Sequence, residues 1–157
     1  MEIDLKRARL EELSDIAYEV YLGQSQTFNY LDIMILKFIG EYGYGSSGNT
    51  DAAFMRAIGK ACLAAWEPAA LIFDFSALTY AWGDRLMQVF DIGADIYLDD
   101  PFPMALIVGE GCEEGIRTLL LGTESHKTIE ETGWVFKEFS HSWAYIEKEL
   151  QRYEGAL

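Results

Sequence analysis

One segment of the chain has the residue types and spacing of a phosphate-binding loop. The pattern Gly-x-Gly-x-x-Gly is matched by a candidate ligand loop made of Gly43, Gly45, Ser46, Ser47 and Gly48. Such loops bind the phosphates of a dinucleotide through backbone amides, and an acid near the end of the following strand binds the ribose. Asp74 occupies that second position here.

Three features of the same segment favour a plain structural loop. Asn49, Thr50 and Asp51 are residue types that cap helices, so the helix is expected to begin after Gly48. In a dinucleotide fold the third glycine lies inside the helix. The distance to Asp74 in sequence is slightly long, and the loop has no lysine to bind phosphate. Ligand binding by residues 43–48 therefore remains an alternative.

A second candidate is Cys112, which begins a predicted helix. The amino end of a helix lowers the pKa of a thiol, but glutamates at 110, 113 and 114 oppose the thiolate. His126 and His141 could act as bases, yet no motif links either of them to the cysteine. We interpret Cys112 as structural and predict no catalytic residue.

A stripe of carboxylates follows at helical spacing. Asp91, Asp95 and Asp99 fall at i, i+4 and i+8, which places them on one face if the segment is an α-helix. Such a face could bind a cation or a basic partner, but a solvated face is the simpler interpretation. No EF-hand spacing is present, and no metal or other cofactor is predicted.

The strongest candidate for a binding site is a turn that follows a buried strand. In open α/β sheets, ligands and partners meet the carboxyl ends of the strands. Tyrosine, tryptophan and arginine also contribute much of the energy at protein interfaces. The predicted partner-binding residues are Tyr80, Trp82, Gly83, Asp84 and Arg85. In the alternative interpretation, Trp82 covers the core and Asp84 caps a helix.

Composition narrows the function classes. The chain has 157 residues, with 26 acidic and 12 basic side chains and a formal net charge of −14. This charge disfavours nucleic acids and anionic membranes and suits solubility or a basic protein partner. Two cysteines make neither a disulfide framework nor a zinc site, and no signal peptide or membrane span is recognisable. A cytoplasmic location is expected.

The hydrophobic pattern predicts alternating strands and helices. Predicted strands cover residues 14–22, 31–39, 70–75, 104–108 and 134–136. Residues 10–22 also fit a helical stripe, but the turn-forming residues 23–26 favour a strand. Predicted helices follow Asn49, Asp84, Cys112 and Ser140, and the second runs to about Tyr97. Residues 1–13 are a leader or a short helix.

This order, β-β-α-β-α-β-α-β-α, predicts a single α/β domain. Its four- or five-stranded sheet is mostly parallel, with helices packed on it and a core spanning residues 14–153. Over residues 32–150 the chain resembles the STAS domain family. The likeness rests on Phe38-Ile39-Gly40-Glu41 and on the strand Asp74-Phe75-Ser76-Ala77-Leu78. In that family a tetrad Asp-Ser-Ser-Gly then opens a helix, and here the tetrad position holds Trp82-Gly83-Asp84-Arg85.

The resemblance implies a regulatory protein-interaction module of the anti-sigma-factor antagonist type. The family's phosphorylated serine or threonine aligns with Asp84, which a serine kinase cannot modify and which carries a single permanent charge. The resemblance thus implies the fold and a partner, without the phosphorylation switch. Two alternatives stay open. One is a crotonase-like enzyme, or an acyl-CoA or nucleotide binder, that uses residues 43–48, and the other is a structural role as a homo-oligomer.

Overall fold

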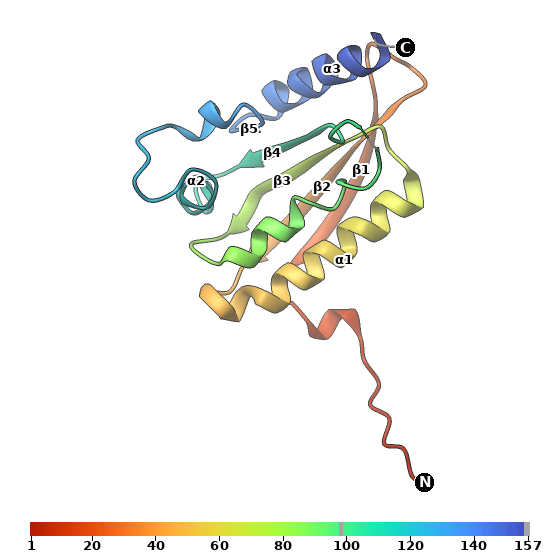
Figure 1. Ribbon diagram of the computed structural model, residues 1–157, viewed down its shortest axis with the longest axis vertical. Coiled ribbons are helices and arrows are strands. Elements are labelled where there is room, and N and C mark those ends of the chain that lie inside the picture. Colours follow the sequence, from red (N-terminus) through yellow and green to blue (C-terminus); the bar gives the residue numbers. More distant parts are fainter. Residues whose placement is uncertain (98, 156–157) are drawn as a thin grey trace.

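The hydrophobic segments of the sequence form a five-stranded sheet. The computed structural model describes residues 1–97 and 99–155. The strands are β1 (Ala17–Gln24), β2 (Asp32–Glu41), β3 (Ala70–Thr79), β4 (Met104–Val108) and β5 (Val135–Phe136), and they lie in this order across the sheet (Figure 1). β1 is antiparallel to β2, and every other neighbouring pair is parallel. The predicted mostly parallel sheet is confirmed, as is the strand assignment for residues 14–22.

The central strands are covered on both faces, as their uninterrupted apolar runs predict. Ile33, Met34 and Leu36 of β2 are inaccessible to solvent, and so are the apolar residues at the start of β3. Alternate residues of these strands enter two separate hydrophobic clusters. The sheet is therefore the middle layer of a three-layer domain.

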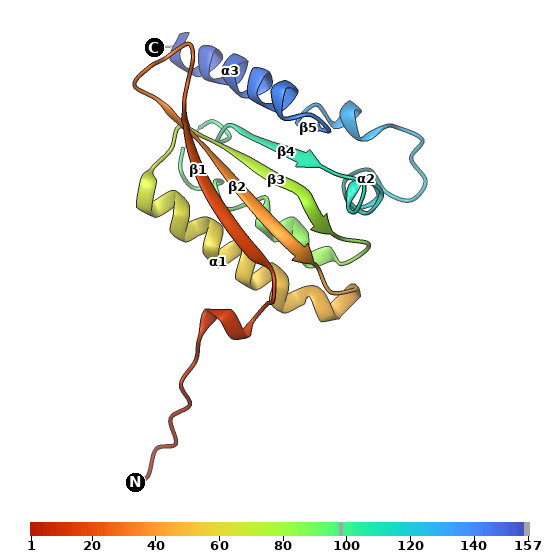
Figure 2. The same cartoon turned by 180° about the vertical axis from the view of Figure 1, so that it is seen from behind.

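Helices of different kinds cover the two faces. α1 (Asn49–Trp66), the 3-10 helix η3 (Asp84–Val89) and α2 (Glu113–Leu121) contribute to the larger cluster. α3 (Phe139–Gly155) lies on the opposite face, where Ile146 and Leu150 pack against β2, β3 and β4 (Figures 1 and 2). The predicted packing role of α3 is confirmed. Among the described residues, no helix has both the length and the apolar character needed to cross a membrane.

The predicted α-helix from Asp84 to about Tyr97 is wrong. The segment is a six-residue 3-10 helix followed by turns. Phe90 and Ile92 are both buried, although residues two apart point to different sides of an α-helix. Ile92 reaches α1 at Gly59, where a Cβ atom would lie only 2.5 Å from its Cδ1. Contact with α1 therefore takes precedence over helical periodicity.

The predicted helix caps are also wrong. α1 begins at Asn49 with Gly48 as its N-cap, so Asn49, Thr50 and Asp51 lie inside its first turn. Asp84 is likewise the first residue of η3 and provides no side-chain cap, and Ser140 lies inside α3. The Asp51 carboxylate has a different task, because it accepts hydrogen bonds from the amide of Gly43 and the hydroxyl of Ser14.

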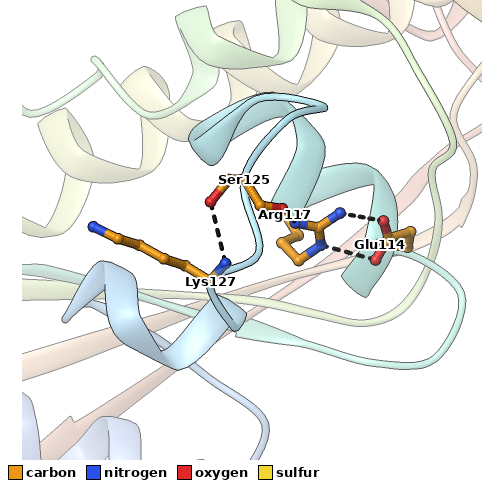
Figure 3. A network of polar contacts seen from close by, with 4 residues as sticks. All are labelled: Glu114, Arg117, Ser125 and Lys127. Carbon is orange, nitrogen blue, oxygen red and sulfur yellow. Dashed lines mark hydrogen bonds and ion pairs between the residues drawn. The ribbon is translucent and has the colours of Figure 1, made fainter.

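Side-chain contacts fix the loop that follows α2. Arg117 donates two hydrogen bonds to the Glu114 carboxylate and a third, of 2.9 Å, to the carbonyl of Ser125. The hydroxyl of Ser125 accepts a hydrogen bond from the amide of Lys127 (Figure 3). These contacts fasten the first part of the connection between α2 and β5.

The amino-terminal segment projects from the domain. Residues 1–9 have no regular structure, and a 3-10 helix, η1 (Leu10–Glu12), connects them to the body (Figures 1 and 2). Ile16 is buried, and the Ser14 hydroxyl bonds Asp51 at 2.5 Å.

Candidate functional site

The two segments predicted as separate sites form one surface in the structure. β2 and β3 are parallel, and Glu41 at the end of β2 lies beside Thr79 at the end of β3. The Gly43–Gly48 loop follows the end of β2, and the turn at residues 80–85 follows the end of β3. The amide of Gly45 donates a hydrogen bond of 2.9 Å to the carbonyl of Trp82. We call the joined loops the carboxyl-edge surface.

Seven residues of the carboxyl-edge surface are exposed: Tyr44, Ser46, Ser47, Ala81, Trp82, Asp84 and Arg85. The rings of Tyr44 and Trp82 lie with their centroids 5.6 Å apart, and these residues are 72% and 51% exposed. Both rings therefore present apolar area to solvent at the end of the sheet. The pair can provide contact area to a partner.

The remaining predicted residues support this surface from below. Tyr80, Gly83, Gly45 and Gly48 are buried. The Tyr80 hydroxyl donates a 2.9 Å hydrogen bond to the carbonyl of Gly83, whose φ of +151° is a conformation that favours glycine. These residues hold the turn in place and do not themselves face solvent.

The glycines of the candidate ligand loop are required by contacts within the protein. At Gly45, where φ is +61°, a Cβ atom would lie 2.6 Å from the Trp82 ring. At Gly48 it would lie 2.2 Å from the ring of Tyr42, and at Gly43 it would meet the backbone of Ser47. Close packing therefore explains the Gly-x-Gly-x-x-Gly spacing without a bound ligand.

Three of the six backbone amides of the loop are engaged within the protein as well. Gly43 donates to the Asp51 carboxylate at 2.8 Å, Gly45 donates to Trp82, and Ser47 donates to the carbonyl of Tyr44. A phosphate would need free amides here and would meet the carboxylate of Asp51 in the first turn of α1. The geometry gives no support to a nucleotide or acyl-CoA in this loop.

Tyr42 is a supporting residue that sequence reasoning missed. It is buried between the two loops, its ring lies 5.1 Å from that of Tyr80, and its hydroxyl has no hydrogen-bond partner among the described residues. Burial, followed by the nearby Asp51 carboxylate, raises the pKa of Tyr42 to about 12. Burial also raises the pKa of Tyr80. The only sequence signal was the position of Tyr42 between a strand end and a glycine.

An acidic pocket of about 540 Å³ adjoins the carboxyl-edge surface. Its lining includes the carboxylates of Glu12, Asp15, Glu41 and Asp51 and contains neither lysine nor arginine. A pocket of this charge attracts basic side chains. The described residues contain no group of three or more His, Cys, Asp or Glu side chains placed to hold a metal ion.

Asp84 stands on the exposed side of the turn. Within the described chain its carboxylate has neither an ion pair nor a hydrogen bond to another side chain, and Arg85 beside it is also exposed. The aspartate is thus presented to solvent and is available to a partner.

Two other candidates from the sequence lie elsewhere and do not form sites. Cys112 is buried, its thiol is 3.4 Å from the carbonyl of Phe75, and burial raises its pKa to about 11. Such a thiol is a poor nucleophile, which agrees with a structural role. Asp91 and Asp95 are exposed but follow the end of η3, so they do not share an α-helical face.

Comparison with known proteins shows what this architecture is similar to. No protein-family model matches the sequence, and no curated protein matches it significantly. The structure is similar to the crystal structure of an anti-sigma factor antagonist from Mycobacterium paratuberculosis, with a TM-score of 0.59 and 14% sequence identity. The alignment covers 84% of this chain and 94% of the other. The chain therefore has the STAS fold that its strand-end motifs indicate.

Proposed function

We propose that this chain is a non-catalytic regulatory module that binds a protein partner at the carboxyl-edge surface. The observation that carries the proposal is the exposed pair Tyr44 and Trp82, held by the hydrogen bond between the two loops. Interfaces commonly centre on such aromatic residues, and arginine is enriched beside them, as Arg85 is here. The regulatory role is proposed by analogy with the structural neighbour, whose name describes an antagonist of an anti-sigma factor.

The chemistry of the surface favours a basic partner. The acidic pocket lies on the Tyr44 side of the aromatic pair, and Asp84 lies on the Trp82 side. A partner that contacts both rings therefore also meets carboxylates, and the net charge of −14 would accelerate its approach. We expect the association rate to fall steeply as ionic strength rises.

The Asp84 position bears on regulation. Because an aspartate replaces the residue type that a serine kinase modifies in the STAS family, we propose that binding here is constitutive and not controlled by phosphorylation at this position. If the carboxylate contributes to the interface, Asp84→Asn should weaken binding with little effect on folding, since the side chain is exposed.

The chain offers a matched control for the aromatic pair. Trp66, at the end of α1, is 52% exposed, which is nearly the same as the 51% of Trp82. Affinity capture from lysate of the source organism would identify the partner, and the dissociation constant would then be measured with the purified partner. Trp82→Ala should raise it about tenfold or more, the effect of losing one strong contact, whereas Trp66→Ala should leave it within about twofold. Equal effects of the two variants would refute this surface.

A ligand panel tests the alternative function. Thermal unfolding is measured with acyl-CoA thioesters, nucleotides and other metabolites, because a ligand that binds the folded state raises the melting temperature. We expect no shift. A shift that Ser46→Ala with Ser47→Ala abolishes would favour the small-molecule function over the docking function.

A further inference from the structure

The projecting residues 1–9 have the pattern of a strand that lacks a sheet. Met1, Ile3 and Leu5 alternate with charged residues, and such a period of two indicates a strand with one buried face. These three side chains are 110%, 68% and 86% exposed, and the segment extends away from the domain (Figures 1 and 2). We call residues 1–9 the arm.

The sheet offers an edge that the arm could extend. β1 pairs on one side with β2 and has no neighbouring strand on the other within the described part of the chain, so its outer backbone groups lack sheet partners there. Tyr18, Tyr21 and Leu22 on this strand are 44%, 52% and 44% exposed. An unprotected edge with exposed apolar side chains is a site for the addition of a further strand.

A groove beside this edge has the composition to receive apolar side chains. It lies between β1 and α3, has a volume of about 920 Å³ and is lined by Tyr21, Ile35, Phe139 and Trp143 among others. Phe139 is 50% exposed. The indole nitrogen of Trp143 has no acceptor among the described residues, although the ring packs closely over Gly23 of β1. The groove therefore offers apolar area that could receive aliphatic side chains.

Charge indicates which segment fits the groove. The arm has three basic and two acidic side chains, whereas residues 10–157 have nine basic and twenty-four acidic ones. Two bodies of this charge repel each other, which disfavours direct pairing of their β1 edges. The positively charged arm can instead approach a negatively charged body.

The geometry separates the arm from the edge of its own chain. Ile16 is buried, and the Ser14 hydroxyl donates a hydrogen bond to Asp51 in the first turn of α1. The 3-10 helix η1 lies just before these residues in the chain. From η1 the arm leaves the sheet and points away from β1 (Figure 2). Six extended residues span roughly 20 Å, so residues 2–7 can pair with most of the eight-residue β1 of another molecule while residues 8 and 9 connect the two.

We propose that two copies of this chain exchange arms. Residues 2–7 of each copy add a strand to β1 of the other, and Ile3 and Leu5 enter the groove beside Trp143. The exchange is reciprocal, so the dimer closes with two-fold symmetry. This proposal does not depend on the proposed function.

Sedimentation equilibrium of the full chain tests the exchange. We expect a dimer whose population rises with concentration up to about 100 µM. Ile3→Asp with Leu5→Asp should raise the dimer dissociation constant about tenfold or more. Glu2→Gln with Asp4→Asn, on the opposite side of the arm, should change it by less than about threefold. Tyr21→Lys on β1 should weaken the dimer as the arm variant does, and circular dichroism should show all variants folded.

Two results would overturn the proposal. One is a wild-type monomer across the whole concentration range, and the other is a dimer that the arm and Tyr21 variants leave intact.

Hydrogen exchange decides where the arm lies. Protection of residues 2–7 that rises with dimer population supports the exchange, whereas protection independent of concentration would show that the arm covers its own chain and would refute it.

Discussion

The amide of Gly45 donates a 2.9 Å hydrogen bond to the carbonyl of Trp82, and the Trp82 ring lies over the space that a Gly45 side chain would fill. This contact joins two loops that follow different strands. It places the exposed rings of Tyr44 and Trp82 side by side at the end of the sheet. The proposed docking surface therefore depends on a glycine that is itself buried.

Substitution of Gly45 should test this dependence. Gly45→Ala places a side chain at φ +61° and 2.6 Å from the Trp82 ring. We expect a loss of at least about 2 kcal/mol in unfolding free energy, combining backbone strain with displacement of the ring. Gly133 is a control for strain alone, because its φ is +89° and no atom lies within 4 Å of its Cβ position. Gly133→Ala should cost about 1 kcal/mol, and equal losses would show that Trp82 does not press on Gly45.

Removing the hydroxyl group should change the unfolding free energy in opposite directions at the neighbouring residues Tyr42 and Tyr80. Tyr80 donates to the carbonyl of Gly83, so Tyr80→Phe should lower the unfolding free energy by about 1 kcal/mol. The buried hydroxyl of Tyr42 has no partner among the described residues, so Tyr42→Phe should raise it by about 1 kcal/mol. Urea unfolding of both variants measures the two changes. Destabilisation by Tyr42→Phe would show that the Tyr42 hydroxyl makes a favourable contact in the folded protein.

Alkaline pH should act on the same pair. Burial favours the neutral phenol and raises the pKa of Tyr42 to about 12, above the ordinary value of about 10. The resulting stabilisation is fully present below pH of about 10 and is lost as the pH rises through about 12. The advantage of Tyr42→Phe over wild type should therefore grow across this interval, as measured by unfolding at a series of pH values. If the difference in unfolding free energy between Tyr42→Phe and wild type stays constant with pH, the pKa of Tyr42 is not raised.

Asp51 should be more important for stability than an ordinary acidic residue. Its carboxylate accepts a 2.8 Å hydrogen bond from the Gly43 amide and a 2.5 Å bond from the Ser14 hydroxyl. Asp51→Ala leaves both donors without this acceptor and should lower the unfolding free energy by about 3 kcal/mol. The exposed Asp95 provides the comparison, and Asp95→Ala should stay within about 0.5 kcal/mol of wild type. A small effect at Asp51 would mean that these contacts contribute little.

Much of the fold could be predicted because each strand has a strong local signal. Met104–Val108 is a strand with the predicted bounds, and the apolar run within β2 is buried on both faces. Local signals were insufficient where tertiary contact decides the structure. The helix expected after Asp84 is replaced by a 3-10 helix and turns, because Ile92 packs against Gly59 of α1.

The candidate site was predictable only in part for a related reason. Sequence identified residues 43–48 and 80–86 separately, since glycine spacing and aromatic content are visible in one chain. Their union depends on the parallel register that sets Glu41 beside Thr79 and on the fit of Trp82 over Gly45. The unpaired hydroxyl of Tyr42 has no sequence signature, because burial depends on both loops at once.

The most direct test of the docking surface is the dissociation constant of the purified partner for three forms of the chain. Wild type, Trp82→Ala and Trp66→Ala are compared by isothermal titration calorimetry, with unfolding curves recorded for each. The account predicts that only Trp82→Ala weakens binding, by about tenfold or more, while all three forms remain folded. Unchanged affinity of a folded Trp82→Ala variant, or an equal loss in Trp66→Ala, would contradict it.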